Sequence, residues 1–156
     1  MTPAIELATK YKVAFSVHQY QHNSNVESYG DEAAASLGID PKQVFKTLVV
    51  ELNSGELAVG VVPVCGSLNL KAIACEASAK KASMADKLKV QRSSGYVLGG
   101  VSPIGQRKPL TTIIDRSAKN FSTIYVSAGK RGLEIELSAN DLANLTNATF
   151  ADISSL

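Results

Sequence analysis

The chain has 156 residues, of which 45% are hydrophobic and 19% are charged, and its net charge is +2 at pH 7. These values are typical of a globular protein that is long enough to bury a substantial core. A charge of +2 excludes a strongly basic nucleic-acid binder, so any contact with RNA must depend on a local patch. We therefore expect residues 1–156 to form one domain.

The amino-terminal segment predicts a helix, with Thr2 as its cap and Pro3 at its first position. The sequence has no basic segment followed by an apolar run, which a signal peptide would require. It also has no stretch near the ~18 apolar residues that span a membrane. We therefore expect a cytoplasmic protein that does not contact membranes.

Residues 15–22 alternate between apolar and polar side chains, which predicts a β-strand. One face of this strand carries His18, Tyr20 and His22. A zinc site would need a carboxylate or cysteine at a matching distance, and because none is apparent we expect no metal. Tyr20 has two interpretations: it lines a pocket, or it lies on the surface of the strand.

Residues 30–38 predict a helix with acidic residues in its first turn and a glycine at its end. Residues 44–52 and 56–64 predict two strands joined by a turn at residues 53–55. Lys46 lies among the apolar and β-branched residues of the first strand, where an unpaired ammonium is costly to desolvate. It therefore either extends to solvent from the strand or contacts a ligand in a pocket.

Residues 67–81 and 85–90 have apolar side chains at helical spacing, which predicts two further helices. Two cysteines, Cys65 and Cys75, have no second pair at metal-ligand spacing. We expect both thiols to be small buried hydrophobes and not to form a disulfide.

The stretch from Gly95 to Gly105 contains four of the 11 glycines of the chain. Glycine permits a positive φ or a close approach of the backbone to a ligand. Residues 96–98 are apolar and predict a strand that leads into the stretch, while Pro103 biases Ser102 toward extended backbone. The stretch is either a rigid loop whose N–H groups point at a ligand or an ordinary bulge or turn.

The last part of the chain predicts a strand at residues 110–115 and a hairpin of residues 121–127 and 133–137. A capping box that begins at Ser138 then predicts a helix at residues 141–145, and a closing strand is expected at residues 149–153. In the hairpin, Glu134 and Glu136 point away from the apolar face. Short strands joined by hairpins and mixed with short helices indicate an α+β domain with a mixed or largely antiparallel sheet.

Few residues in this sequence could perform proton chemistry. The histidines occur only in one early strand, and the sequence has no nucleophile elbow, Walker loop or dinucleotide fingerprint. What remains is the glycine-rich loop, Lys46, Tyr20 and the acidic residues near the turn at residues 129–132. Such a set can bind an anion or polarise a carbonyl. From the residues alone, we predict a ligand-binding α+β domain.

Five segments together resemble the YbaK family of bacterial Cys-tRNA(Pro) deacylases, which are related to the editing domain of prolyl-tRNA synthetases. These segments are residues 1–4 (MTPA), 30–33 (GDEA), 45–48 (FKTL), 95–106 (GYVLGGVSPIGQ) and 124–133 (IYVSAGKRGL). The resemblance runs from end to end of the chain. It implies a mixed, barrel-like β-sheet flanked by short helices, and hydrolysis of cysteine wrongly esterified to tRNA(Pro).

The resemblance also assigns a site. The Gly-x-x-x-Pro motif of the family falls on residues 99–103, its strand lysine on Lys46 and its tyrosine on Tyr20. Its acidic position is often aspartate and is Glu134 in this chain, so the role of this residue is the least defined. The family implies that the thiol of the esterified cysteine attacks its own carbonyl, which agrees with the missing general base.

These assignments suggest a role for each group. The amides of Gly99, Gly100 and Val101 are expected to stabilise an oxyanion, and Lys46 to neutralise a phosphate or hold the ester. The expected substrate-binding residues are Tyr20, Ser102, Pro103 and Glu134. The expected tRNA-binding residues are Arg107, Lys108, Lys130 and Arg131.

The expected partners are the acceptor end of mischarged Cys-tRNA and, transiently, prolyl-tRNA synthetase, with neither DNA nor a cofactor. Cys-tRNA(Cys) is a further candidate substrate. Two alternatives stay open: a deacylase for another small amino acid such as alanine, and a non-catalytic adaptor that binds tRNA or the synthetase. Deacylation of purified mischarged tRNAs distinguishes the three.

Overall fold

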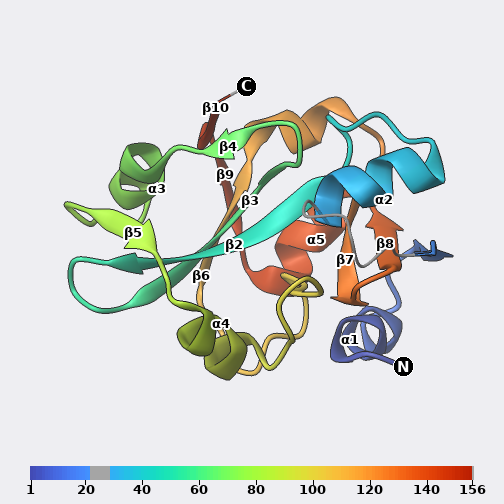
Figure 1. Cartoon of the computed structure of the whole chain (residues 1–156), viewed down its shortest axis with the longest axis horizontal. Helices are drawn as coiled ribbons and strands as arrows, with labels where there is room; N and C mark the ends of the chain where they lie inside the picture. Colours follow the sequence, from blue (N-terminus) through green and yellow to red (C-terminus); the bar gives the residue numbers. More distant parts are fainter. Residues whose placement is uncertain (22–28, 156) are drawn as a thin grey trace.

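The computed structural model describes residues 1–21 and 29–155. Its elements along the chain (Figure 1) are α1 (Pro3–Lys10), β1 (Phe15–Gln19), α2 (Tyr29–Leu37), β2 (Phe45–Leu52), β3 (Leu57–Pro63), β4 (Ser67–Leu68), α3 (Leu70–Glu76), β5 (Ala82–Met84), α4 (Lys87–Ser94), β6 (Thr111–Asp115), η1 (Arg116–Asn120), β7 (Ile124–Lys130), β8 (Leu133–Leu137), α5 (Ala139–Thr146), β9 (Thr149–Ala151) and β10 (Ser154–Ser155).

The capping residues place the helix ends largely as the sequence predicts. The side chains of Thr2 and Ser138 accept hydrogen bonds from the first turns of α1 and α5. The helix predicted at residues 67–81 is shorter, because Asn69 caps α3 and the flanking residues enter β4 and β5. In the described part of the chain, no helix has the length and apolar character needed to cross a membrane.

Three sheets are present in the described residues. The largest has the strand order β5-β2-β3-β6-β9, in which β2 pairs antiparallel with β3 and β5, and β6 pairs parallel with β3 and β9. A second sheet has the antiparallel order β1-β8-β7, and β4 pairs with β10. The mixed α+β class is confirmed. The largest sheet is open, with β5 and β9 at its edges, so it does not close into a barrel.

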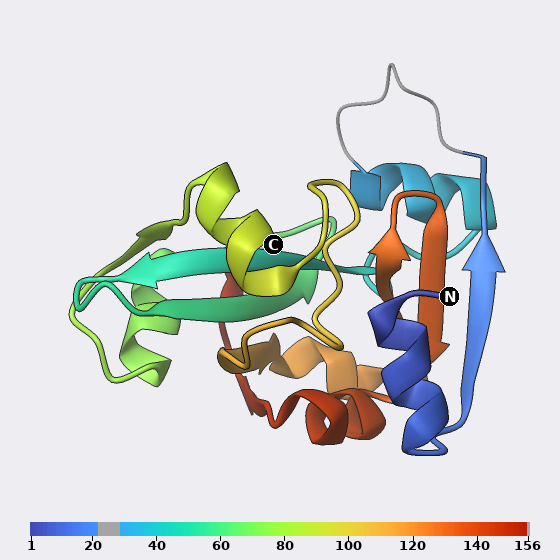
Figure 2. The ribbon, with the colours of Figure 1, turned by 90° about the horizontal axis from the view of Figure 1, so that it is seen from below.

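The β1-β8-β7 sheet is covered on both faces (Figure 2). On one face, α1 and α5 contribute Ala4, Ala8 and Leu142 to the main core. On the other face, Ala33 and Ala34 of α2 pack in a smaller cluster that includes Tyr125 of β7. The two glutamates of β8 point to this second face, which the alternation of the strand alone would assign to solvent.

The prediction that both cysteines are buried is wrong. The thiols of Cys65 and Cys75 are free and exposed. Cys65 lies in the turn after β3, and Cys75 lies on the outer side of α3, whereas its neighbours Ile73 and Ala74 face the core. The helix therefore directs Ile73 and Ala74 inward and leaves the thiol outside.

Candidate active site

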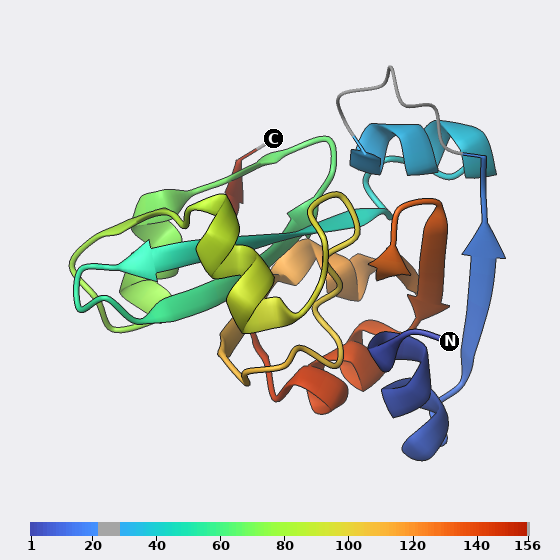
Figure 3. The same cartoon turned by 60° about the horizontal axis from the view of Figure 1, so that its bottom comes forward.

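A pocket of about 320 Å³ is lined by residues of β2, α4, the loop after α4 and the β1-β8-β7 sheet. Figure 3 shows how these elements are arranged. Most of its lining residues are apolar, such as Phe45, Leu48 and Val90. Of the predicted site residues, it brings together Lys46, Gly99, Val101, Tyr20 and Glu134. An apolar pocket with a few convergent polar groups is the usual form of a small-molecule site.

β2 brings Lys46 and Thr47 to the wall of the pocket. The Lys46 side chain is partly buried and has no hydrogen bond or ion pair within residues 1–21 and 29–155. The hydroxyl oxygen of Thr47 is fully buried and also has no partner there. A buried polar group without a partner costs about 1–3 kcal/mol. Both groups are therefore available to a ligand.

The glycine-rich stretch is a loop, and the strand predicted at residues 96–98 is absent. α4 starts at an Asp86 cap, continues to Ser94 and ends at Gly95, which has a φ of 79°. Glycine in this left-handed conformation is a common end of a helix. The backbone therefore reaches the loop from a helix, and residues 96–98 are irregular.

Hydrogen bonds hold the two ends of the loop together. The backbone N–H of Arg107 donates to the carbonyl of Ser94 at 3.0 Å. The hydroxyl of Tyr96 donates to the carbonyl of Ile104 at 2.6 Å. Burial raises the pKa of Tyr96 to about 12, so this donor keeps its proton at neutral pH. The loop is thus a compact surface loop with adjacent ends and a buried aromatic inside it.

Two glycines allow the loop to approach other backbone segments. A Cβ on Gly100 would lie 2.8 Å from both the Arg131 nitrogen and the Lys130 Cα. A Cβ on Gly105 would lie 2.8 Å from the carbonyl oxygen of Pro3. Because these atoms belong to backbone, only glycine permits both contacts. The loop is therefore fixed to the β7–β8 turn and to the start of α1.

The loop offers two unpaired amides where the sequence predicted three. The N–H of Gly100 donates to the carbonyl of Val97 at 3.0 Å and closes a turn. Gly99 and Val101 both line the pocket, and within the described part of the chain their N–H groups have no hydrogen-bond partner. An oxyanion site in this loop would thus use Gly99 and Val101, with Gly100 holding the loop in place.

Ser102 and Pro103 are buried in the loop and are not among the described residues that line the pocket. The Ser102 hydroxyl oxygen accepts a hydrogen bond from the Ile104 N–H at 3.2 Å. The Ser102 carbonyl accepts another from the Gln106 side chain at 3.0 Å. This geometry supports a structural role for both residues in place of the predicted substrate contact.

Glu134 forms part of the pocket wall with 6% of its surface exposed. Burial raises the pKa of Glu134 to about 8, so most of this carboxyl is protonated at pH 7. The carboxyl has no hydrogen bond or ion pair in the described residues. Burial, and then the nearby Glu134, also raise the pKa of Tyr20. At pH 7 both groups are therefore mostly protonated.

Ser127 is a pocket residue that the sequence analysis missed. It is the partner of Glu134 in the β7–β8 pairing, just before a shift in register. Its hydroxyl oxygen accepts a hydrogen bond from the Gly129 N–H at 3.1 Å, which leaves its proton for another acceptor. A single serine in an alternating strand carries no signal, and only its pairing with Glu134 could have identified it.

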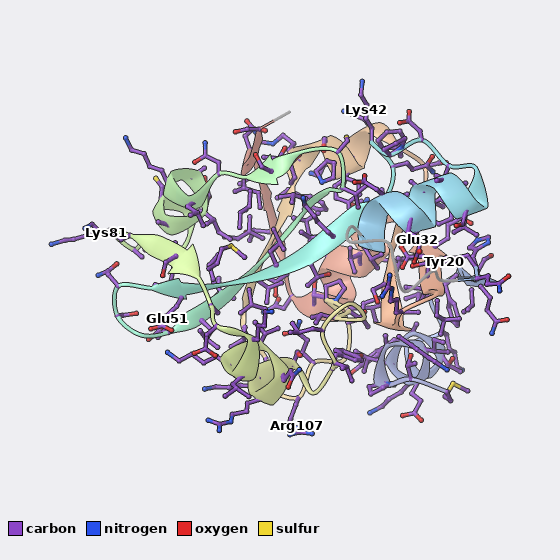
Figure 4. The ribbon with its side chains drawn as sticks, in the orientation of Figure 1. Tyr20, Glu32, Lys42, Glu51, Lys81 and Arg107 are labelled. Carbon is purple, nitrogen blue, oxygen red and sulfur yellow. The ribbon has the colours of Figure 1, made fainter. Side chains whose placement is uncertain are left out.

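The four predicted tRNA-binding residues have different environments. Arg107, Lys108 and Lys130 are exposed, and Arg107 extends outward beside α4 (Figure 4). A side-chain nitrogen of Arg131 lies 3.6 Å from a carboxylate oxygen of Glu32, which is buried on α2. Arg131 therefore helps to attach α2 to the β7–β8 turn, and its charge already has a partner.

His18 belongs to a polar cluster on the same sheet face, where it is the β1 partner of Glu134. Its Nε2 lies 2.8 Å from the Glu136 carboxylate, which also accepts a hydrogen bond from Thr123 at 2.5 Å. The hydrogen bond from Thr123 and then that from His18 lower the pKa of Glu136. His22 lies outside the described residues. Within residues 1–21 and 29–155, no group of three His, Cys, Asp or Glu residues could hold a metal ion.

A family model and two bacterial proteins match this chain. The model of the "Aminoacyl-tRNA editing domain" family matches residues 23–145. The "Putative Cys-tRNA(Pro)/Cys-tRNA(Cys) deacylase EbsC" of Enterococcus faecalis is 36% identical over 152 residues, which cover 97% of this chain and 92% of that protein. The "Uncharacterized protein YwhH" of Bacillus subtilis is 24% identical over 116 residues, covering 74% and 73% of the two chains.

Two solved structures share the whole fold. The "hypothetical protein APE2540" superposes with a TM-score of 0.87 at 25% identity, over 99% of this chain and 100% of the other. A structure described as "a putative trans-editing enzyme for prolyl tRNA synthetase" gives a TM-score of 0.83 at 20% identity, over 100% and 99%. The family match over residues 23–145 confirms the resemblance drawn from the motifs: the chain belongs to the family of aminoacyl-tRNA editing domains.

Proposed function

We propose that this chain is an aminoacyl-tRNA deacylase that releases cysteine from tRNA(Pro), acting in trans beside prolyl-tRNA synthetase. The carrying observation is a pocket that combines two unpaired amides and a lysine, with no histidine or cysteine among the described residues that line it. Such a pocket can polarise an ester carbonyl while the substrate provides the nucleophile. Family membership supports ester hydrolysis on tRNA, and the name of the Enterococcus relative supports cysteine as the amino acid.

In this proposal the polar end of the pocket receives the amino acid. The α-ammonium group lies beside Glu134 and supplies the positive charge that this buried carboxyl lacks. Because an adjacent cation favours the ionised form, the two groups form an ion pair on binding. Ser127 and Tyr20 are the remaining polar side chains at this end, and the hydroxyl of Ser127 can donate a hydrogen bond to the substrate.

The reaction follows from the position of the thiol. The sulfur of the esterified cysteine forms a bond to its own carbonyl carbon, the ester C–O bond breaks, and the thiol proton passes to the 3′ oxygen of the tRNA. Water then opens the cyclic thioester to give cysteine. The N–H groups of Gly99 and Val101 stabilise the oxyanion, and Lys46 holds the ester or a phosphate. Effective molarities for such attack reach about 10⁵ M or more.

The experiment offers the same tRNA(Pro) carrying cysteine, serine, alanine or S-methylcysteine, and measures release of each amino acid. Cysteine should be released at least about 100-fold faster than the others, since only a free thiol is an effective internal nucleophile. Comparable release of serine or S-methylcysteine would require activated water and would reject the thiol mechanism. Preferential release of alanine would assign another substrate, and no release at all would favour the adaptor.

A further inference from the structure

A cluster of exposed apolar side chains surrounds one side of the pocket opening. It consists of Met84 of β5, Leu88 of α4, and Val97 and Leu98 of the loop. We call this set the apolar rim. Leu88 is 62% exposed and Val97 is 74% exposed, whereas Met84 and Leu98 also line the pocket. The apolar surface is therefore continuous from the pocket to the outside, and exposed patches of this kind often mark binding sites.

The same part of the chain carries a concentrated positive charge. Residues 85–110 contain five of the 16 Lys and Arg residues but only one of the 14 acids, a net charge of +4 that leaves −2 for the other residues. The five cations are Lys87, Lys89, Arg92, Arg107 and Lys108. All are exposed, and among the described residues only Lys89 has an ion-pair partner, Glu51. α4 and the loop lie side by side (Figures 1 and 3), so the charge surrounds the apolar rim.

We propose that the apolar rim and the cations around it bind the unpaired nucleotides of a tRNA 3′ end, next to the nucleotide whose ester enters the pocket. The inference rests on the proposed function, because it places that ester in the pocket. Unpaired nucleotides combine flat apolar bases with one phosphate charge each, and proteins bind them with apolar contacts inside a basic groove. A protein partner would account for the apolar rim, but the charge of +4 favours a polyanion.

The position of Lys87 supports continuity between the two regions. This residue lines the pocket from the first turn of α4, and Leu88 follows it on the exposed surface. A nucleotide strand that leaves the pocket past Lys87 would therefore meet Leu88 of the apolar rim next. Lys130, by contrast, lies at the β7–β8 turn, whose backbone Gly100 approaches.

The test compares a double variant, Leu88→Ser with Val97→Ser, with a matched control, Val17→Ser with Leu70→Ser. The control residues are also exposed apolar side chains but lie on β1 and α3, away from the pocket. The probe is an RNA hairpin without an esterified amino acid that ends in four unpaired nucleotides with the sequence ACCA. It is compared with the same hairpin with a blunt end. Fluorescence anisotropy gives Kd for each protein, and denaturation confirms that each variant is folded.

We expect the rim variant to bind the overhanging hairpin about tenfold more weakly, while the control variant matches the wild type and the blunt hairpin shows no difference. Arg92→Ala should reduce the slope of log Kd against log salt by about 0.7, the value for one contact to a single strand. If the double variant fails to fold, Val97→Thr, which preserves the shape of the side chain, replaces it with an expected threefold effect.

The proposal is overturned if the rim variant binds the overhang like the wild type, if both hairpins weaken equally, or if the wild type does not bind the overhang better than the blunt end. It is also overturned if the variant loses affinity for prolyl-tRNA synthetase but retains affinity for RNA, which would assign the apolar rim to a protein partner. Deacylation is measured separately. A wild type that binds the overhang through the apolar rim but releases no amino acid would reject the proposed function and leave this inference standing.

Discussion

Glu134 and Glu136 point to the same face of β8, two residues apart, and meet opposite surroundings. Glu134 is buried in the pocket wall without a hydrogen bond or ion pair in the described residues, and its pKa rises to about 8. Glu136 accepts hydrogen bonds from Thr123 and His18, and its pKa falls. At pH 7 the first carboxyl is therefore mostly neutral and the second is charged.

The difference indicates which end of this sheet face is built for a ligand. A carboxyl that already has its partners contributes to folding, whereas an unpaired buried carboxyl is costly until something binds to it. Pairs of titratable groups whose environments separate their pKa values are typical of active sites. The Glu134 end faces the pocket, and the Glu136 end holds β1, β7 and β8 together.

Replacing Lys46 should have the largest effect, because it is the cation that β2 contributes to the pocket. We expect Lys46→Ala to lower kcat/KM for deacylation about 100-fold, equivalent to about 2.7 kcal/mol, without a change in the unfolding midpoint. Lys42→Ala is the matched control, since Lys42 is an exposed lysine that points away from the protein (Figure 4). An unfolded Lys46→Ala variant, or one with normal turnover, would refute a functional role.

Gly100→Ala should disturb the pocket beside Glu134 and leave the hydrogen bonds of Glu136 unchanged. The new Cβ would meet the backbone of the β7–β8 turn at 2.8 Å and displace the loop that carries the free amides. We expect a loss of about 30-fold in kcat, and a smaller loss for Ser102→Ala, whose hydroxyl bonds only within the loop. The reverse ranking in single-turnover deacylation would instead point to the Ser102 side chain.

Neutral replacement of each glutamate compares the two ends directly. Glu134→Gln should lower kcat/KM about tenfold, because the amide cannot form an ion pair with the substrate ammonium. Glu136→Gln should change kcat/KM by less than about twofold. Both variants are measured with Cys-tRNA(Pro) at pH 7, and equal losses would contradict the assignment of different roles to the two residues.

The free energy of unfolding should depend on pH in different ways through Glu134 and through Glu136. Because the folded pKa of Glu134 lies above its unfolded value of 4.5, the folded state binds the extra proton between pH 4.5 and about 8. The free energy of unfolding should therefore fall with rising pH in this window, by up to about 1.4 kcal/mol per pH unit. Glu136, with its lowered pKa, loses its contribution only as the pH falls below 4.5.

Urea denaturation at pH 5, 6, 7 and 8 measures this slope. Glu134→Gln should flatten it, and Glu136→Gln should leave it unchanged. An identical slope in the wild type and Glu134→Gln would mean that Glu134 is already ionised in the folded protein.

The smallest expected effect is a loss of folding stability when a hydrogen bond to Glu136 is removed. Thr123→Val removes the first hydrogen bond of this carboxylate and should cost about 1 kcal/mol of stability at pH 7. The kinetics of deacylation should be unaffected, because Thr123 does not line the pocket among the described residues. Thermal denaturation beside an activity assay checks both expectations, and a loss of activity without a loss of stability would contradict them.

Local signals in the sequence were enough to locate most elements. Thr2 and Ser138 identified helix starts, and the alternating strands before and after residues 53–55 identified the first hairpin. Lys46 was recognisable because a lysine among apolar strand residues is unusual. These features depend on neighbours in the chain, which the sequence displays directly.

Features that depend on distant residues were not predictable. Glu134 is buried because its face of the sheet is covered by α2, which precedes it by almost a hundred residues. The pairing of Arg131 with Glu32 has the same origin. The strand predicted at residues 96–98 was wrong because apolar residues also occur in loops that bury an aromatic such as Tyr96.

The loop from Gly95 to Gly105 offers the pocket the main-chain amides of Gly99 and Val101, which has a consequence for how such proteins diverge. Most single substitutions at Val97, Leu98 or Val101 change a side chain and leave the amides in place. Random mutagenesis with selection for lost activity should therefore return few hits in this loop, concentrated at its glycines. Exposed positions of the loop are free to vary between relatives, so the nucleic acid that each one recognises can change while the hydrolytic chemistry is retained.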